Sequence, residues 1–161
     1  MFGAGGQKLC LIVLGKANQV IGNKLKSEFI KRVPGLDPLV KKINDIYKKT
    51  EYRGNAWIPA ADGRRIYCDS LHKSLNYLLQ SFEAISCKAA VAWFVRRMDE
   101  EDIPYDPLVW YHDEFEVEVD EQYAKRTLEI AIEAYQESGK VFNMMILDGA
   151  GKIGDNWYEV H

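Results

Sequence analysis

The feature of this sequence that most constrains its fold is one long segment with helical periodicity, from Leu71 to about Met98. Its apolar residues keep the period that places side chains on one face of a helix; they are Leu75, Leu78, Leu79, Phe82, Ile85 and Val91. Asp69 and Ser70 precede the segment, and both residue types are favourable helix N-caps. We therefore expect this segment to form the longest and most buried helix of the chain.

Two helical segments with lysine-rich faces are predicted before the long helix. The first covers residues 8–33 and is expected to be broken or kinked, because Gly15 and Gly22 weaken it. Pro34-Gly35 ends this helix, and a second helical period runs through residues 36–52. Up to residue 65 the sequence has 13 Lys and Arg against 5 Asp and Glu, and the remainder has 8 against 19. A basic segment such as residues 1–65 favours binding to a polyanion such as nucleic acid. Helical faces that are simply exposed to solvent can have the same composition.

Short strands are predicted on both sides of the long helix. Residues 56–59 and 65–68 flank the turn dipeptide Asp62-Gly63 and predict a hairpin. After the long helix, residues 108–111 and 115–119 read as strands that meet at His112-Asp113-Glu114. An amphipathic helix over residues 121–139 and a third strand over 142–147 follow. Helices and antiparallel strands in this order predict an α+β fold.

The bulk properties indicate one globular domain of 161 residues, 47% of them hydrophobic. No apolar run approaches the roughly 20 residues that cross a bilayer, and no leader is recognisable. We therefore expect a soluble, cytoplasmic protein without a membrane partner. Cys10, Cys68 and Cys87 lie far apart and form no CxxC pair, so they are expected to be reduced core residues.

Asp113 and Glu114 form the most unusual local feature, two adjacent acids at a hairpin tip beside His112. Neighbouring carboxylates raise each other's proton affinity, and a divalent cation relieves the repulsion. Magnesium takes one or two protein carboxylates plus phosphate oxygens, so this step is a candidate half-site. Asp and Glu are also ordinary turn residues, and these three residues alone leave both interpretations open.

His112-Asp113-Glu114, followed by Phe-Glu-Val, resembles motif C of the family A (polymerase I-like) DNA polymerases. The segment that carries His72, Asn76 and Gln80 resembles the DNA-tracking helix of that family, especially in its phage branch. Spacings of four put these side chains on one helical face. The resemblance implies that they test base-pair shape in the minor groove, where all base pairs offer similar acceptors.

Weaker matches follow in the family's order and extend the resemblance to nearly the whole chain. Asp62-Gly63-Arg64-Arg65 resembles the hairpin before the tracking helix, and Phe2-Gly3-Ala4-Gly5 resembles the end of the fingers helix of motif B. The C-terminus is similar to that of phage members, with an aromatic-rich strand and a final histidine. The resemblance implies that residues 1–55 are fingers-derived basic helices and that residues 56–161 are the palm portion with motif C.

The resemblance implies nucleotidyl transfer with two magnesium ions about 3.5 to 4 Å apart. Asp113 would be a metal ligand, Glu114 an auxiliary carboxylate at the metals, and His112 a contact to the primer terminus. Arg64, Phe2 and the basic residues up to 65 would contact DNA. The complete enzyme would bind primer-template DNA and dNTP, in the host cytoplasm if the protein is phage-encoded.

The chain lacks other parts of that family's site, because the motif A aspartate and the triphosphate-binding residues of motif B would lie upstream of Met1. We expect half of a two-metal site and an isolated chain that does not extend primers. The missing parts would come either from a separate upstream polypeptide or from an upstream segment of one longer protein of which this chain is a piece. The predicted sheet lacks its central strand, and its open edge also permits dimerisation of the isolated chain.

Two other functions fit parts of the sequence. A non-catalytic DNA-binding or subunit-interaction module would keep the fold and the basic helices without activity. A metal-dependent nuclease would need further carboxylates near the turn, and its candidates are Glu116, Glu118 and Asp120.

Overall fold

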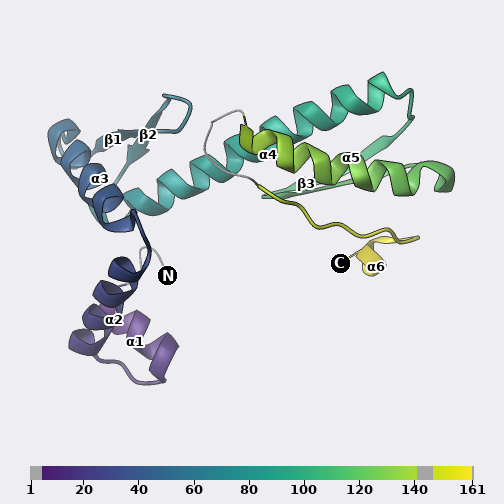
Figure 1. Ribbon diagram of the computed structural model, residues 1–161. Helices are drawn as coiled ribbons and strands as arrows, with labels where there is room; N and C mark the ends of the chain where they lie inside the picture. Colours follow the sequence, from purple (N-terminus) through teal and green to yellow (C-terminus); the bar gives the residue numbers. More distant parts are fainter. Residues whose placement is uncertain (1–4, 141–146, 161) are drawn as a thin grey trace. The chain divides into compact units, whose positions relative to one another are not determined.

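The computed structural model describes residues 5–140 and 147–160 of the chain. These residues adopt an α+β fold with helices and two small antiparallel sheets (Figure 1). The elements are, in order, α1 (Gly6–Leu14), α2 (Gln19–Arg32), α3 (Leu36–Thr50), β1 (Ala56–Pro59), β2 (Arg65–Cys68), the 3-10 turn η1 (Leu71–Lys73), α4 (Ser74–Glu100), β3 (Asp106–Tyr111), β4 (Glu114–Glu118), α5 (Glu121–Lys140) and α6 (Trp157–Val160). They form two compact units, Met1–Ser81 and Phe82–His161.

The predicted break in the first basic helix is confirmed, since α1 and α2 are separate helices. Gly15 ends α1 in the left-handed region, with φ of 69°, and the Asn18 side chain caps α2. Gly22 serves close packing rather than weakening α2. A Cβ atom at Gly22 would lie 1.7 Å from the carbonyl oxygen of Gly6, so the two helices approach through glycine.

The first hairpin, β1–β2, forms where the sequence predicted it and packs on α3. Ile43 and Tyr47 of α3 are buried with three residues of the hairpin, Ala56, Ile58 and Cys68. The Thr50 hydroxyl donates to the Trp57 carbonyl at 2.7 Å and accepts from its N–H at 3.0 Å, which joins helix to strand. The hairpin lies in the first compact unit, Met1–Ser81.

The long helix begins with η1 and continues as α4. Asp69 and Ser70 precede it as expected, but neither acts as a side-chain cap. The Asp69 carboxylate instead accepts from Lys73 at 2.8 Å and from Tyr77 at 3.0 Å. These hydrogen bonds lower the pKa of Asp69.

At 27 residues α4 is the longest helix described, as predicted. In its second half a stripe of residues four apart is buried, Ala90, Phe94 and Met98. The stretch from Leu71 to Glu100 is long and apolar enough to cross a membrane by length and composition alone. Core helices of soluble proteins meet the same criterion, and the stripe of α4 packs into a protein core.

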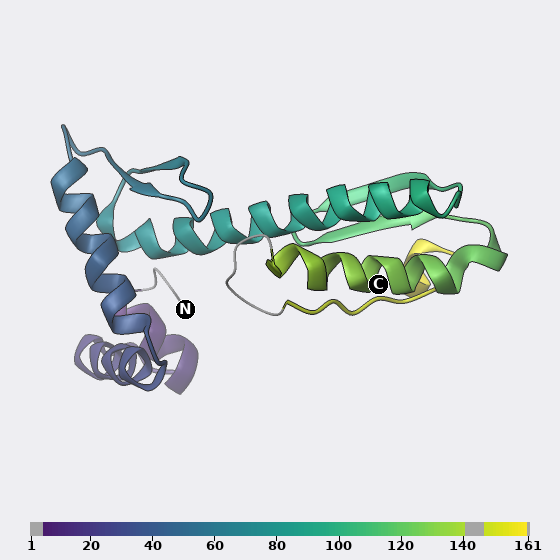
Figure 2. The same ribbon diagram turned by 45° about the horizontal axis from the view of Figure 1, so that its top comes forward.

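The second unit has its core between α4, α5 and one face of the β3–β4 hairpin. Phe94 and Met98 of α4 are buried against Ile130 and Ala134 of α5. The Phe94 ring contacts Phe115 of β4, with 5.0 Å between centroids. Figure 2 shows α5 alongside the second half of α4, with the hairpin running along both.

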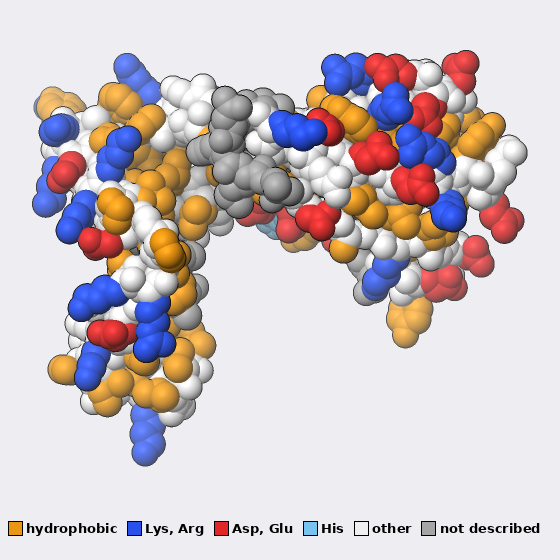
Figure 3. Space-filling view, viewed as in Figure 1, with side chains coloured by type: hydrophobic (Ala, Val, Ile, Leu, Met, Phe, Trp, Pro, Cys, Tyr) orange, Lys and Arg blue, Asp and Glu red, His pale blue; other side chains and the backbone are white. Residues whose placement is uncertain are grey.

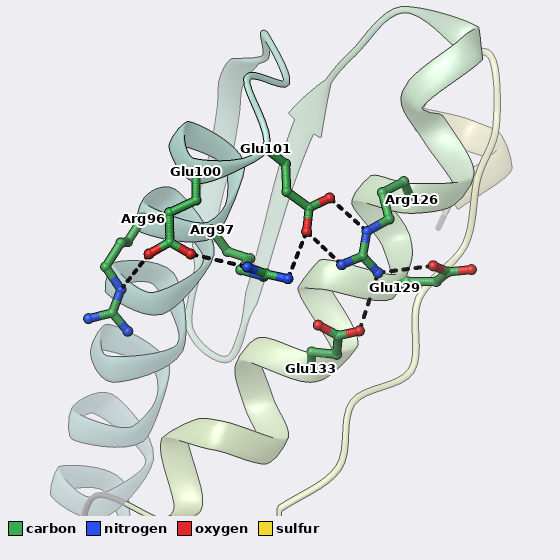
Figure 4. A network of polar contacts seen from close by, with 7 residues as sticks. All are labelled: Arg96, Arg97, Glu100, Glu101, Arg126, Glu129 and Glu133. Carbon is green, nitrogen blue, oxygen red and sulfur yellow. Dashed lines mark hydrogen bonds and ion pairs between the residues drawn. The ribbon is translucent and has the colours of Figure 1, made fainter.

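A network of ion pairs joins the end of α4 to α5 (Figure 4). The Arg126 guanidinium donates two hydrogen bonds to Glu101, at 2.8 and 2.7 Å, in the bidentate geometry that is strongest for such pairs. Arg126 also contacts Glu129 at 3.1 Å and Glu133 at 3.3 Å. The hydrogen bonds from Arg126 lower the pKa of the Glu101 carboxyl.

Two predictions concern the C-terminal part of the chain. The third strand, expected at 142–147, lies outside the described residues except for Leu147, which belongs to no strand. The predicted final strand is wrong, because Trp157–Val160 forms the short helix α6. The Glu159 carboxylate accepts from the Asp155 N–H at 3.0 Å and from the Asn156 amide at 2.8 Å, which favours this helical turn.

The three cysteines are free and buried, as the sequence predicted. Among the described residues the predicted palm sheet consists of β3 and β4 alone, and these strands pair antiparallel. The second edge of β3 is therefore open within the described part of the chain.

Candidate functional site

The candidate metal-binding residues lie on a two-residue turn. Tyr111 pairs with Glu114 at the end of the β3–β4 ladder, so only His112 and Asp113 make the reversal. His112 has φ of 54°, in the left-handed region that favours glycine. A bulky residue held in this conformation stores strain, which is common at functional sites.

The backbone of this turn is tied to helix α5. The Tyr135 hydroxyl donates a hydrogen bond of 2.5 Å to the Asp113 carbonyl. The Tyr135 ring stacks on Phe115, the second residue of β4, with 6.1 Å between centroids. Burial raises the pKa of the Tyr135 phenol. Burial also raises the pKa of the neighbouring Cys87 thiol.

Asp113 and Glu114 fit part of a magnesium site. Both residues are exposed, and adjacent positions at the end of a hairpin give two carboxylates that a ligand can reach. Magnesium usually takes one or two protein carboxylates and completes its octahedron with phosphate oxygens and water. Among the described residues no group of three or more His, Cys, Asp and Glu side chains is placed to hold a metal. The donor set therefore suits an ion shared with a bound phosphate group or another polypeptide.

The nuclease alternative would draw on further acids near the turn. Glu116 and Glu118 follow the turn along β4 and Asp120 follows the strand. These acids do not gather with Asp113 into a metal-binding group within the described residues.

The three residues of the expected DNA-tracking face lie in the first unit. His72 belongs to η1, one turn before the α-helix proper, whereas Asn76 and Gln80 lie in α4. Asn76 and Gln80 share a helical face because they are four residues apart. The side chains of His72 and Gln80 are exposed, and that of Asn76 is partly buried.

Basic side chains gather over the helices of the first unit, and acidic ones over the second (Figure 3). At the tip of the β1–β2 hairpin, Arg64 forms an ion pair with Asp62 at 2.6 Å. Arg65 lies over the Trp57 ring, 4.6 Å from its centroid. Phe2, the remaining predicted DNA contact, lies outside the described residues.

Apolar residues of β3 are exposed. Leu108 is 56% exposed, Trp110 50% and Tyr111 68%, next to the open edge of the strand. An open strand edge of this kind leaves backbone N–H and C=O groups with which another strand can pair.

Tyr135 was missed by sequence reasoning. It lies 22 residues after Asp113, in an ordinary amphipathic helix, and only tertiary packing brings its hydroxyl to the turn. One feature of the sequence could have indicated it. Tyr135 lies on the inward side of α5, and a buried phenol usually needs a hydrogen-bond partner.

Comparison with known proteins identifies relatives of the whole chain. No protein-family model matches the sequence. Over its full length the chain is 31% identical to the DNA-directed DNA polymerase of Enterobacteria phage T3 and 30% identical to that of Escherichia phage T7. Over 99% of its length it is 26% identical to the DNA-directed DNA polymerase of Escherichia phage Phieco32. The chain spans about one quarter of the length of each relative.

A solved structure shares the fold. The POL domain of Pol1 from M. smegmatis, in complex with DNA primer-template and dNTP, matches with a TM-score of 0.70 at 17% identity. The match covers 85% of this chain and 25% of that chain. The resemblance to family A polymerases drawn from the motifs is thereby confirmed, and the chain is a relative of the phage DNA-directed DNA polymerases that corresponds to one quarter of their length.

Proposed function

We propose that this chain is the C-terminal part of a template-directed DNA polymerase and that it supplies the motif C turn for nucleotidyl transfer. The observation that carries the proposal is the Asp113-Glu114 turn, which is anchored to α5. The chain that contains it aligns over its full length with one quarter of the length of two phage DNA polymerases. An upstream polypeptide would supply motifs A and B. Such an enzyme would act in the cytoplasm of the phage host.

The turn would contribute ligands and orientation. Asp113 would bind a metal through its carboxylate, and Glu114 would add negative charge beside it. Magnesium, when bound, supplies positive charge that stabilises the phosphoryl oxygens during transfer. His112, held beside Asp113 in the turn, would contact the primer terminus with its imidazole. The 4.3 Å contact between the rings of Tyr111 and His112 supports a fixed orientation of that imidazole.

The first unit would bind DNA. Asn76 and Gln80, with His72 in the preceding turn, would donate to the acceptors that every base pair presents in the minor groove. Arg64 and the lysines of α2 and α3 would contact phosphates, which contributes affinity without sequence preference. Replacing Asn76 and Gln80 by Ala should weaken duplex binding and raise mispair extension in the complete enzyme.

The exposed side chains and open edge of β3 support an upstream polypeptide as partner. An added strand would pair with the free backbone groups of β3 and cover Leu108 or Trp110. Without that partner, two copies of the chain could pair through the same edge, so we expect concentration-dependent dimerisation of the isolated chain.

Reconstitution tests the proposed function. The chain is mixed with the polypeptide encoded upstream, and extension of a labelled primer on a DNA template is measured with magnesium and dNTP. We expect extension with both polypeptides together and none with either alone. No extension by a complex that forms and binds primer-template would rule the polymerase function out.

A non-catalytic DNA-binding module is the second candidate, favoured by the basic helices of the first unit. It shares salt-sensitive duplex binding with the proposed function, so binding alone does not separate them. It predicts that Lys to Glu changes at Lys24, Lys41 and Lys48 weaken DNA binding while the reconstituted complex stays inactive.

A further inference from the structure

The geometry points to Tyr135 as a positioning residue that fixes the Asp113 carboxylate by a hydrogen bond to the Asp113 backbone carbonyl. The inference rests on the proposed function, because that function makes Asp113 a metal ligand. Tyr135 itself would touch neither metal nor substrate. It would act through the backbone of Asp113, the residue that would bind the metal.

The Tyr135 ring is held on two sides within the second unit. One side stacks on Phe115 at 6.1 Å between centroids. On another, Gly149 lies so close that a Cβ atom there would be 3.2 Å from Cδ2 of the ring. Asp148 holds this segment to α5, since its carboxylate accepts from the Gln136 side chain at 3.1 Å and from the Gly149 N–H at 2.9 Å. The hydroxyl is therefore a fixed donor.

The hydrogen bond from Tyr135 anchors the turn to a helix outside the hairpin. Two-stranded hairpins are marginally stable by themselves, and every residue of β3 is exposed. His112 is held at positive φ, a conformation that costs about 1 kcal/mol or more for a residue with a side chain. A hydrogen bond to the Asp113 carbonyl opposes relaxation of this strain, and it fixes the direction of the Asp113 Cα–Cβ bond.

The hydroxyl serves a purpose that packing alone does not explain. A phenylalanine would fill the space between Phe115 and Gly149 equally well, and burying a phenol has a cost unless it is hydrogen-bonded.

Tyr135→Phe tests the inference, and Tyr123→Phe is the matched control. Tyr123 lies on the same helix and packs on the same core, and its hydroxyl makes no hydrogen bond to a described residue. The first measurement uses the chain alone, with Mn²⁺ as the probe and the NMR amide signals of residues 112–114 as readout. We expect Mn²⁺ to broaden these signals, and Tyr135→Phe to require about tenfold more Mn²⁺ for the same effect. Tyr123→Phe should match the unmodified chain.

The second measurement uses the reconstituted polymerase. Tyr135→Phe should lower kcat by about tenfold and raise the magnesium concentration for half-maximal rate, with KM for dNTP unchanged. Tyr123→Phe should stay within about twofold of the unmodified enzyme. If Tyr135 only stabilised the fold, its replacement would not raise the magnesium requirement of the enzyme while leaving the KM for dNTP unchanged.

The outcomes distinguish this inference from the proposed function. If the unmodified pair fails to extend primers, the polymerase function is wrong, and the Mn²⁺ titration of the chain still decides the role of Tyr135. Equal Mn²⁺ dependence of Tyr135→Phe and the unmodified chain would overturn the inference. Parallel losses in both variants, or no broadening in the unmodified chain, would overturn it as well.

Discussion

Tyr111 and Glu114 are directly paired across the β3–β4 ladder, and this pairing leaves only His112 and Asp113 to reverse the chain. The pairing makes the carboxylates of Asp113 and Glu114 part of a tight hairpin end rather than of a loop. It also forces His112 into the left-handed region at φ of 54°. The turn therefore combines a strained residue with an exposed carboxylate, and both properties can be measured.

Replacement of His112 should reveal the strain. His112→Gly should be more stable than His112→Ala by about 1 kcal/mol, because glycine adopts positive φ without a steric penalty. Urea unfolding of the chain, followed by circular dichroism, measures the difference. Both variants lack the imidazole, so they should be equally impaired in primer extension. If the alanine variant were as stable as the glycine variant, the turn would not be strained in solution.

The Arg126 network should stabilise the second unit in a pH-dependent way. Arg126 lowers the pKa of Glu101, so the stabilisation is complete above the ordinary glutamate pKa of about 4.3 and is lost as pH falls through the lowered value. Arg126→Met should reduce the melting temperature at pH 7 by roughly 3 to 8 °C. The difference from the unmodified chain should shrink below about pH 4.

Arg96→Met is the matched control for the network. Arg96 is 68% exposed and contacts Glu100 at 3.9 Å, a pair that contributes little. Its replacement should leave the melting temperature nearly unchanged. Equal effects of the two arginine variants would mean that the bidentate pair with Glu101 has no special role.

Gly22→Ala should disrupt the contact between α1 and α2, because the added Cβ atom would lie 1.7 Å from the Gly6 carbonyl oxygen. We expect a loss of about 1 to 3 kcal/mol in local stability, which hydrogen exchange of the α1 and α2 amides measures. Gly5→Ala is the control, since nothing lies within 4 Å of a Cβ atom there. Unchanged exchange in Gly22→Ala would contradict the close approach of the helices.

Trp110→Lys should weaken binding of the upstream polypeptide by about tenfold, because a charge would replace apolar contact area beside the open edge of β3. Titration calorimetry of the two polypeptides measures this affinity. Tyr67→Lys is the control, since Tyr67 is 77% exposed on the other hairpin. Equal affinities for both variants would place the partner elsewhere.

Local features of the fold followed from the sequence where the pattern was strong. The β1–β2 hairpin formed at the predicted residues because Asp62-Gly63 supplies a turn, with Gly63 at φ of 83°. The break between α1 and α2 was visible in Gly15. The final aromatic segment was predicted as a strand and is a helix, because the caps from Glu159 outweigh the strand propensity of its aromatic residues.

The candidate site was only partly predictable. Asp113 and Glu114 were evident from their adjacency and from the flanking strands, which are local properties. The anchor at Tyr135 was not, because it depends on how α5 packs against the hairpin. Likewise, the pattern put His72 on one helix with Asn76 and Gln80, whereas the chain turns through η1 before the α-helix begins.

The most direct test of the account is the rate of primer extension by the reconstituted pair when Asp113 is replaced. Asp113→Asn should lower the rate by about a thousandfold, because a lost metal ligand removes several kcal/mol of transition-state stabilisation. Asp106→Asn, at the far end of the same hairpin, should leave the rate within about twofold. Full activity of Asp113→Asn would show that the motif C turn holds no catalytic metal.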